Sequence, residues 1–257
     1  MAQRYHVWMH TLRIAAWSGP RTISTAMMRS WENRPDTVVC DEPFYAYYLK
    51  ETGLTHPGRE DVLAHHESNP EKVIEMLIGS CEQAVQYQKH MAHHLLPNVD
   101  RGWFAKCTHI FLLRHPREMI TSLMKQLPEP SIEETGLPQQ LQLFESIRKQ
   151  GITPLVIDSK DILQHPRAML LLVCEHLGIR FYEEMLSWSA GPRDTDGIWA
   201  PHWYASVEAS TGFAPWRHKD EQVPTELESM CVECEEIYAQ LAAHKMTVQG
   251  RDHAPNI

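Results

Sequence analysis

The chain has 257 residues, a length sufficient to bury a full core, and 43% of them are hydrophobic and 22% charged. Its formal net charge of −9 excludes the general basic surface of a nucleic-acid binder or of a protein held on an anionic membrane. The apolar runs are too short for a membrane span and residues 1–10 lack a signal-peptide pattern, so we expect a cytoplasmic protein.

In chain order, the sequence alternates predicted strands with predicted helices. Apolar and β-branched runs indicate strands at residues 12–17, 37–40, 86–91 (with weak alternation), 109–114 and 154–158. Helical spacing indicates helices at 24–33, 71–85, 117–125, 138–150, 161–177 (interrupted early at Pro166, capped by Gly178) and about 224–244. This order predicts an α/β fold: a three-layer sandwich with a central, mostly parallel sheet and a P-loop-like strand–loop–helix. We expect residues 1–257 to form a single domain.

The six cysteines do not indicate a metal site. Cys231 and Cys234 have the spacing of a metal-ligand pair, but they lie in a helical pattern with no second Cys/His pair nearby. We expect Cys231 and Cys234 to be two partly buried thiols on one helix.

A polar loop joins the first strand to the first helix, with the sequence Ser18-Gly19-Pro20-Arg21-Thr22-Ile23-Ser24-Thr25. Amides at a helix N-terminus bind phosphate readily. Gly19 lets the backbone approach a ligand, Arg21 supplies a guanidinium, and the other side chains supply hydroxyls at Thr22, Ser24 and Thr25. The Walker lysine of a kinase-like loop is absent. The alternative is a helix cap with no ligand.

A second polar segment follows the predicted strand 109–114. Arg114 stands at the strand end, and Ser122 lies eight residues further on, two turns into a helix. These two side chains can converge on one anion. The alternative is a buried arginine followed by an unrelated surface serine.

Together the two segments resemble the sulfotransferase family, especially its bacterial-type members, over roughly residues 12–215. Residues 18–25 are similar to the 5′-phosphosulfate loop of that family, and Arg114-x-Pro116-x5-Ser122 is similar to its 3′-phosphate motif. The resemblance implies 3′-phosphoadenosine 5′-phosphosulfate as co-substrate, a small-molecule acceptor with a hydroxyl or amine, and no metal. The donor-binding residues it implies are Ser18, Gly19, Pro20, Arg21, Thr22, Ser24, Thr25, Arg114 and Ser122.

Two segments depart from the animal cytosolic members of the family. Their Lys-Thr-His-Leu-Pro segment, whose His is the base, is only loosely matched here by residues 89–94. Their late Arg-Lys-Gly loop is matched only by residues 191–199, which give Arg193, Gly197 and Trp199 as candidates for a third nucleotide contact. The aromatic residues of 191–213 are candidates for a lid over adenine or over the acceptor.

Four residues are candidates for the chemistry. We expect Arg21 to contact the bridging and leaving oxygens, and Glu42, directly after the second strand, to be the general base. Glu42 has an alternative role as a cap of the helix that follows it. His93 is the second candidate for the base and Lys89 is a candidate contact of the sulfuryl oxygens, unless both are solvated residues after an edge strand.

Two other functions remain open from the sequence. One is a P-loop-type kinase that uses ATP and Mg²⁺, for which the Lys-Ser/Thr pair is missing. The other is a nucleotide-binding protein without catalytic activity, which the joint presence of Arg21, Glu42, Arg114 and Ser122 disfavours.

Overall fold

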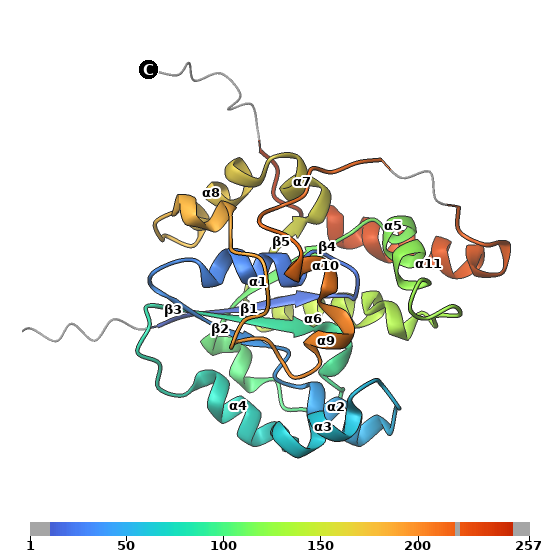
Figure 1. Cartoon of the computed structure of the whole chain (residues 1–257), viewed down its shortest axis with the longest axis horizontal. Helices are drawn as coiled ribbons and strands as arrows, with labels where there is room; N and C mark the ends of the chain where they lie inside the picture. The colour runs from blue at the N-terminus through green and yellow to red at the C-terminus, as the bar shows by residue number, and fades with distance from the viewer. Residues whose placement is uncertain (1–10, 219–221, 249–257) are drawn as a thin grey trace, which may run out of the picture.

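A computed structural model describes residues 11–218 and 222–248 and contains one five-stranded sheet (Figure 1). The strands are β1 (Leu12–Ser18), β2 (Thr37–Asp41), β3 (Val85–Met91), β4 (Thr108–Leu113) and β5 (Leu155–Asp158). They lie in the order β2-β3-β1-β4-β5, and all four pairings are parallel. The predicted parallel α/β sheet is confirmed. Residues 1–10, where no signal peptide is predicted, lie outside the described residues.

The helices complete the chain between and after these strands. The α-helices are α1 (Ser24–Glu32), α2 (Tyr45–Thr52), α3 (Arg59–His65), α4 (Pro70–Ile78), α5 (Pro116–Leu123), α6 (Leu137–Lys149), α7 (Ser159–Gln164), α8 (Pro166–His176), α9 (Ala200–Trp203), α10 (Ala205–Glu208) and α11 (Glu228–Ala242). Short 3-10 turns are η1 (Ala92–His94), η2 (Gly102–Lys106), η3 (Glu133–Thr135), η4 (Glu183–Leu186) and η5 (Thr225–Leu227). None of the helices within 11–218 and 222–248 is long and apolar enough to cross a membrane.

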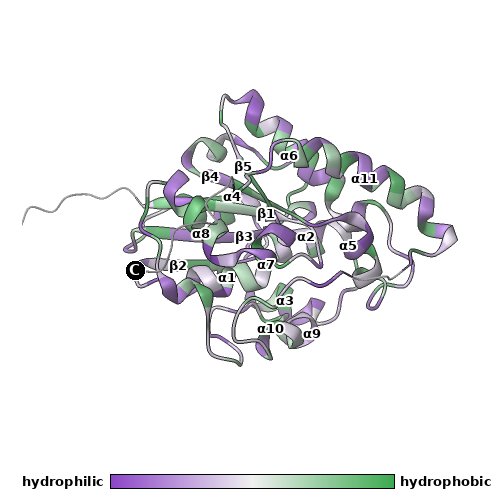
Figure 2. Ribbon diagram, turned by 90° about the horizontal axis from the view of Figure 1, so that it is seen from above, coloured by the Kyte–Doolittle hydropathy of each residue, from purple (hydrophilic) through white to green (hydrophobic). Residues whose placement is uncertain are grey.

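Strand residues alternate between two apolar layers, because successive side chains point to opposite faces of a sheet. Ala15 and Trp17 of β1 pack on the face covered by α4, α6 and α11. Ile14 and Ala16 pack on the other face, which α1, α7 and α8 cover. In Figure 2 stretches of the sheet are coloured as hydrophobic, whereas the helices carry residues of both kinds. The three-layer arrangement predicted from the sequence is therefore present.

Two local predictions differ from the structure, and a third is confirmed. The strand at 85–91 lies between β2 and β1, so it is not an edge strand. The helix predicted to reach residue 85 ends at Ile78, because Gly79 and the polar residues after it stop it. The predicted helix 161–177 is two helices that meet at Pro166, and Gly178 caps the second with a φ of +67° as expected.

The cysteine pair is a packing feature. Cys231 and Cys234 are free and fully buried on α11. Burial raises the pKa of Cys231 to about 11 and also raises that of Cys234, so both stay protonated thiols at neutral pH. Within the described part of the chain no group of three or more His, Cys, Asp or Glu residues is arranged to hold a metal ion.

The order of the strands sets the position of a ligand crevice. The chain leaves β1 for β2 on one side through α1, and it leaves the neighbouring β4 for β5 on the other side through α5 and α6. In an open parallel sheet, ligands bind beyond the carboxyl ends of two adjacent strands whose connections run in opposite directions. Here these strands are β1 and β4, which carry the two polar segments.

Candidate active site

The loop between β1 and α1 presents the N-terminus of α1 without a side-chain cap. The N-cap residue is Ile23, which has no side-chain acceptor to offer to the first amides of the helix. The Thr22 hydroxyl donates to the Gly19 carbonyl at 3.2 Å and shapes the turn. A Cβ at Gly19 would collide with the carbonyl oxygen of Thr135 in η3, so only glycine fits at this close approach of the two segments. Ser18 is buried, and its hydroxyl donates to the His90 carbonyl of β3 at 3.3 Å.

Two residues of the predicted site have unusual backbone conformations. Arg21 has a φ of +56° and Glu42 a φ of +41°, and no other non-glycine residue in the described ranges has a positive φ. Such conformations cost on the order of 1–3 kcal/mol and cluster at functional sites. One follows β1 and the other follows β2, at the same edge of the sheet.

Arg21, Arg114 and Ser122 come together in the structure. The Nε of Arg21 donates to the Ser122 hydroxyl at 3.1 Å, and Nη1 of Arg114 donates to the Arg21 carbonyl at 2.5 Å. Burial and the neighbouring positive charge of Arg114 lower the pKa of the Arg21 guanidinium. Glu118 pairs with Arg114 at 3.3 Å, which leaves the Arg21 guanidinium, side by side with Arg114 and a hydroxyl, as a site that an anion would stabilise. The Arg21 side chain thus lies at the Arg114–Ser122 motif, and its contact with the bridging and leaving oxygens stays a prediction.

A cavity of about 580 Å³ opens beside Arg114. Glu118, Lys160 and Trp216 are part of its wall. The Lys160 ammonium lies 4.5 Å from the centre of a Trp216 ring, and the Trp216 indole N–H donates to Glu118 at 3.2 Å. Sequence reasoning did not select Lys160 or Trp216 as ligand contacts, because neither stands in a recognisable motif. Their neighbours in space include Arg114, which follows β4, and Glu118 of α5, both distant from them in the chain.

A buried ion cluster lies at the ends of β2 and β3. The Lys89 ammonium donates to Asp41 at 2.8 Å, to Glu42, and to the Tyr204 hydroxyl at 2.7 Å. Lys89 is 1% exposed, so the alternative of a solvated residue after an edge strand is wrong. An ammonium group has three N–H donors, and these three partners occupy all of them. Lys89 therefore holds the carboxylates in this structure rather than facing a ligand.

Glu42 is a largely buried carboxyl group whose pKa is raised. Burial raises the pKa of its carboxyl group, Lys89 opposes the increase, and the negative charge of Asp41 adds to it. Its side chain stays 11% exposed. The alternative role as a helix cap is wrong, because Phe44 is the N-cap of α2 and no side chain caps that helix. The raised pKa brings Glu42 closer to neutral pH, where a carboxylate base is more effective.

His93 has the opposite pKa shift. Burial and the nearby His56 lower its pKa to about 4, so its imidazole is neutral at pH 7 and a weak base. Its Nδ1 atom is buried without a hydrogen-bond partner in the described residues and would lie 3.2 Å from a Cβ at Gly136. Of the two candidates for the base, the pKa shifts favour Glu42.

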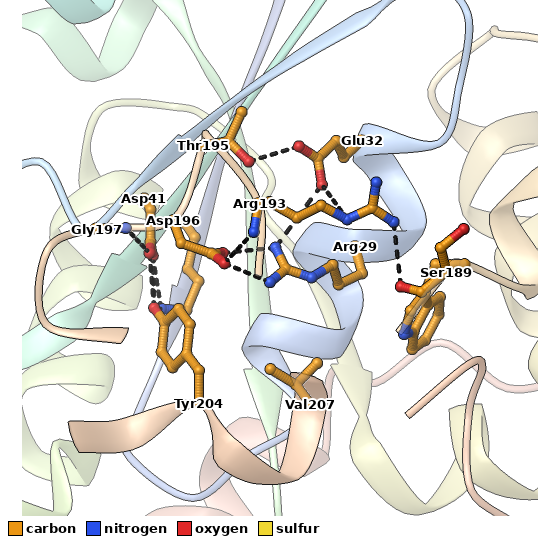
Figure 3. A network of polar contacts seen from close by, with 12 residues as sticks. Arg29, Glu32, Asp41, Ser189, Arg193, Thr195, Asp196, Gly197, Tyr204 and Val207 are labelled. Carbon is orange, nitrogen blue, oxygen red and sulfur yellow. Dashed lines mark hydrogen bonds and ion pairs between the residues drawn. The ribbon is translucent and has the colours of Figure 1, made fainter. Parts of the chain in front are cut away.

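The segment 191–204 is fastened to α1 and to Asp41 (Figure 3). The fully buried Arg29 binds Asp196 through two hydrogen bonds of 2.6 and 2.7 Å, and the Gly197 amide donates to Asp41 at 3.0 Å. Trp199 is 1% exposed and packs in an apolar cluster with Tyr45. Arg193 lies 4.0 Å from Glu32 of α1.

The residues predicted for a third nucleotide contact thus lie apart from the Arg21–Arg114–Ser122 group. Among the described residues, none of Arg193, Gly197 and Trp199 forms a hydrogen bond or ion pair with Arg21, Arg114 or Ser122. Their role in nucleotide binding stays a prediction.

We expect the Asp196→Ala variant to lower the free energy of unfolding by about 3–5 kcal/mol, because it leaves the buried Arg29 guanidinium without its carboxylate. Glu183→Ala is the control, since it breaks the exposed pair with Arg167 and should cost only about 0–1 kcal/mol. Urea denaturation followed by circular dichroism measures both. Equal losses for the two variants would show that the 191–204 segment is not held by this ion pair.

A family model described as a sulfotransferase domain matches residues 12–227. Among solved structures, the chain is similar to the sulfotransferase domain of an olefin synthase from Synechococcus PCC 7002, with 18% identity, 90% of this chain and 95% of that chain covered, and a TM-score of 0.57. A sulfotransferase from Alicyclobacillus acidocaldarius has a TM-score of 0.51 at 12% identity, with 92% and 97% covered. At these identities the two structures establish the fold.

The curated relatives are longer proteins. The branched-chain-amino-acid aminotransferase-like protein 1 of Arabidopsis thaliana is 39% identical over 202 residues, which cover 78% of this chain and 36% of that protein. The corresponding protein 2 of the same plant is 33% identical over 232 residues, covering 90% of this chain and 41% of that protein. The chain thus spans about two fifths of the length of these relatives.

Proposed function

Since the chain belongs to the sulfotransferase family, we propose that it transfers a sulfuryl group from 3′-phosphoadenosine 5′-phosphosulfate to a hydroxyl or amine of a small molecule. The observation that carries this proposal is the meeting of Arg21, Arg114 and Ser122 beside the uncapped start of α1. One anion site lies at the arginines and another at the helix N-terminus, as a nucleotide with phosphates on both its 3′ and 5′ positions requires.

The two phosphates have separate places in this proposal. The 5′-phosphosulfate lies on the amides at the start of α1, where the helix dipole favours negative charge. The 3′-phosphate lies between Arg114 and Ser122, and Arg21 contributes its guanidinium from the loop side. The nucleoside extends into the 580 Å³ cavity, where the Trp216 ring offers a surface for stacking.

The proposed base is close enough to act on an acceptor at the 5′ end. Glu42 directly follows β2, Ser18 ends β1, and only β3 separates the two strands. Neighbouring strands are about 4.8 Å apart, so the two strand ends are separated by roughly 10 Å. This space accommodates a sulfuryl group and the acceptor oxygen or nitrogen in line.

In the proposed reaction, the acceptor oxygen or nitrogen attacks sulfur while its proton moves to the Glu42 carboxylate. The bond between sulfur and the bridging oxygen breaks, and the electron pair stays with the 5′-phosphate of adenosine 3′,5′-bisphosphate. Amides of α1 stabilise the charge that develops on the leaving phosphate. Positioning and electrostatics supply most of the rate, as in phosphoryl transfer.

We expect adenosine 3′,5′-bisphosphate to raise the melting temperature without Mg²⁺. At 100 times the dissociation constant a ligand adds about 2.7 kcal/mol, which corresponds to roughly 5–10 °C for a protein of this size. ADP and ATP with Mg²⁺ are the comparisons in the same thermal-shift titration. A shift with ATP and Mg²⁺ alone would favour the kinase, and no shift with the bisphosphate would refute the sulfotransferase proposal.

A further inference from the structure

The ion cluster around Glu42 includes one residue that comes from a distant part of the chain. Tyr204 follows α9, is 4% exposed, and lies 162 positions from Glu42 in the sequence. Its hydroxyl oxygen is 2.7 and 2.9 Å from the two carboxylate oxygens of Asp41 and 3.4 Å from Oε1 of Glu42. It also accepts hydrogen bonds from Lys89 and from the Trp199 indole, at 2.7 and 3.2 Å.

The single phenolic proton therefore has only carboxylates to bind. The other two positions around the hydroxyl oxygen accept N–H groups, and a hydroxyl has one donor and two acceptor sites. Donation to Asp41 neutralises part of its charge, which leaves the Lys89 ammonium able to hold Glu42 as well. Removal of the phenol would leave Lys89 short of one acceptor and Asp41 short of one donor.

The segment that carries Tyr204 is itself fixed. Arg29 and Asp196 form a buried ion pair, and the Gly197 amide donates to Asp41 (Figure 3). These contacts hold the segment that leads to Tyr204 against the ion cluster. Arg29 lies on α1, the same helix whose N-terminus forms the proposed donor site. The contacts connect the donor helix, the 191–204 segment and the proposed base through side chains that are almost fully buried.

We propose that Tyr204 is a positioning residue, which holds the Glu42 carboxylate ionised and in place through Asp41 and Lys89. This inference rests on the proposed function for the role of Glu42 as a base. Tyr204 acts on the acid–base state of Glu42 without touching the substrate itself.

The other charged and titratable groups near Glu42 belong to the elements around it. His94 of η1 has its Nδ1 atom 3.7 Å from Oε2 of Glu42, and burial keeps this imidazole neutral by lowering its pKa well below the usual value. Tyr45 of α2 has its pKa raised by burial and by Glu42, so it stays protonated. Among the charged neighbours, Lys89 and Asp41 act on Glu42 directly, and Tyr204 bonds to both.

The test is the pKa of Glu42 itself. In protein labelled with ¹³C at the glutamate δ-carbon, Glu42→Gln identifies the Glu42 resonance, and a pH titration gives its pKa in wild type and in Tyr204→Phe. Loss of the phenol removes the donor that offsets the charge of Asp41 and that lies 3.4 Å from Glu42, and both changes disfavour the ionised form of Glu42. We expect the Glu42 pKa to rise by about one unit, comparable to the worth of one hydrogen bond to a charged group. In the pH–rate profile for turnover of the phosphosulfate donor, the loss of rate at low pH should move to higher pH by the same amount.

Tyr47→Phe is the matched control. Tyr47 is a buried tyrosine whose hydroxyl bonds to Asn98 at 2.8 Å, away from the cluster, so the same deletion should leave the Glu42 titration unchanged. If Tyr204→Phe does not fold, 3-fluorotyrosine at position 204 is the second variant. Its more acidic phenol should lower the Glu42 pKa.

An unchanged Glu42 pKa in the Tyr204 variants, or an equal shift in Tyr47→Phe, would overturn the proposal. Because this titration needs neither donor nor acceptor, its outcome is independent of whether the bisphosphate binds.

Discussion

We expect Glu42→Gln to lower turnover of the phosphosulfate donor by about 10²–10⁴-fold, while the affinity for adenosine 3′,5′-bisphosphate stays the same. The amide has nearly the shape of the carboxylate but cannot take a proton from the acceptor. Glu42 is also two strands away from the loop that follows β1, so its charge is not needed to hold the nucleotide. The measurement is the rate of bisphosphate release from the phosphosulfate donor, alongside a binding titration.

Glu75→Gln is the matched control for this variant. Glu75 is exposed on α4, and the same change of carboxylate to amide there should leave the rate unchanged. Near-normal turnover of Glu42→Gln would remove Glu42 as the base. His93 would then be the next residue to test, although its lowered pKa makes it a weak base.

Substitution of Arg114 by alanine should weaken bisphosphate binding by roughly 10–150-fold. This range corresponds to the loss of one hydrogen bond between charged groups, about 1.5–3 kcal/mol. ADP has no 3′-phosphate, so its affinity should fall much less. Calorimetric titration of both nucleotides into wild type and Arg114→Ala measures the difference.

Arg167→Ala gives the background effect of removing one positive charge. Arg167 is exposed at the start of α8 and pairs with Glu183, so its loss should change neither affinity. Equal losses of bisphosphate and ADP affinity in Arg114→Ala would mean that Arg114 does not distinguish the 3′-phosphate.

The fold was largely predictable from the sequence because strand and helix periodicity are local. The strand runs at 12–17 and 109–114 have apolar neighbours on both faces of a parallel sheet, and such continuous apolar runs are typical of buried strands. The strand at 85–91 was harder to place, because it contains Gln88, Lys89 and His90. Gln88 and Lys89 are buried there because their partners are Leu77 of α4 and Asp41 of β2, whereas His90 bonds to Gln88 and stacks on Trp17 of β1.

The donor side of the site was predictable for a related reason. Gly19, Arg21, Arg114 and Ser122 stand in two short motifs, and each motif follows a strand whose carboxyl end lies at the same edge of the sheet. The positions of the two motifs in the sequence therefore already indicated that they lie close together at that edge. The structure adds that Arg21 reaches Ser122 across more than a hundred residues of chain.

The base side was only partly predictable. Glu42 was selected from its position after a strand, but its raised pKa depends on burial and on the charge of Asp41, which Lys89 and Tyr204 oppose. Tyr204 has no motif, and its contact with Glu42 depends on the return of the chain across the ends of β2 and β3. Tertiary packing of this kind leaves no local signal.

A crystal structure with adenosine 3′,5′-bisphosphate shows directly where the two phosphates bind. We expect the 5′-phosphate on the amides at the start of α1 and the 3′-phosphate within hydrogen-bonding distance of Arg114 and Ser122. A bisphosphate bound elsewhere, or with its 3′-phosphate away from Arg114, would contradict this expectation.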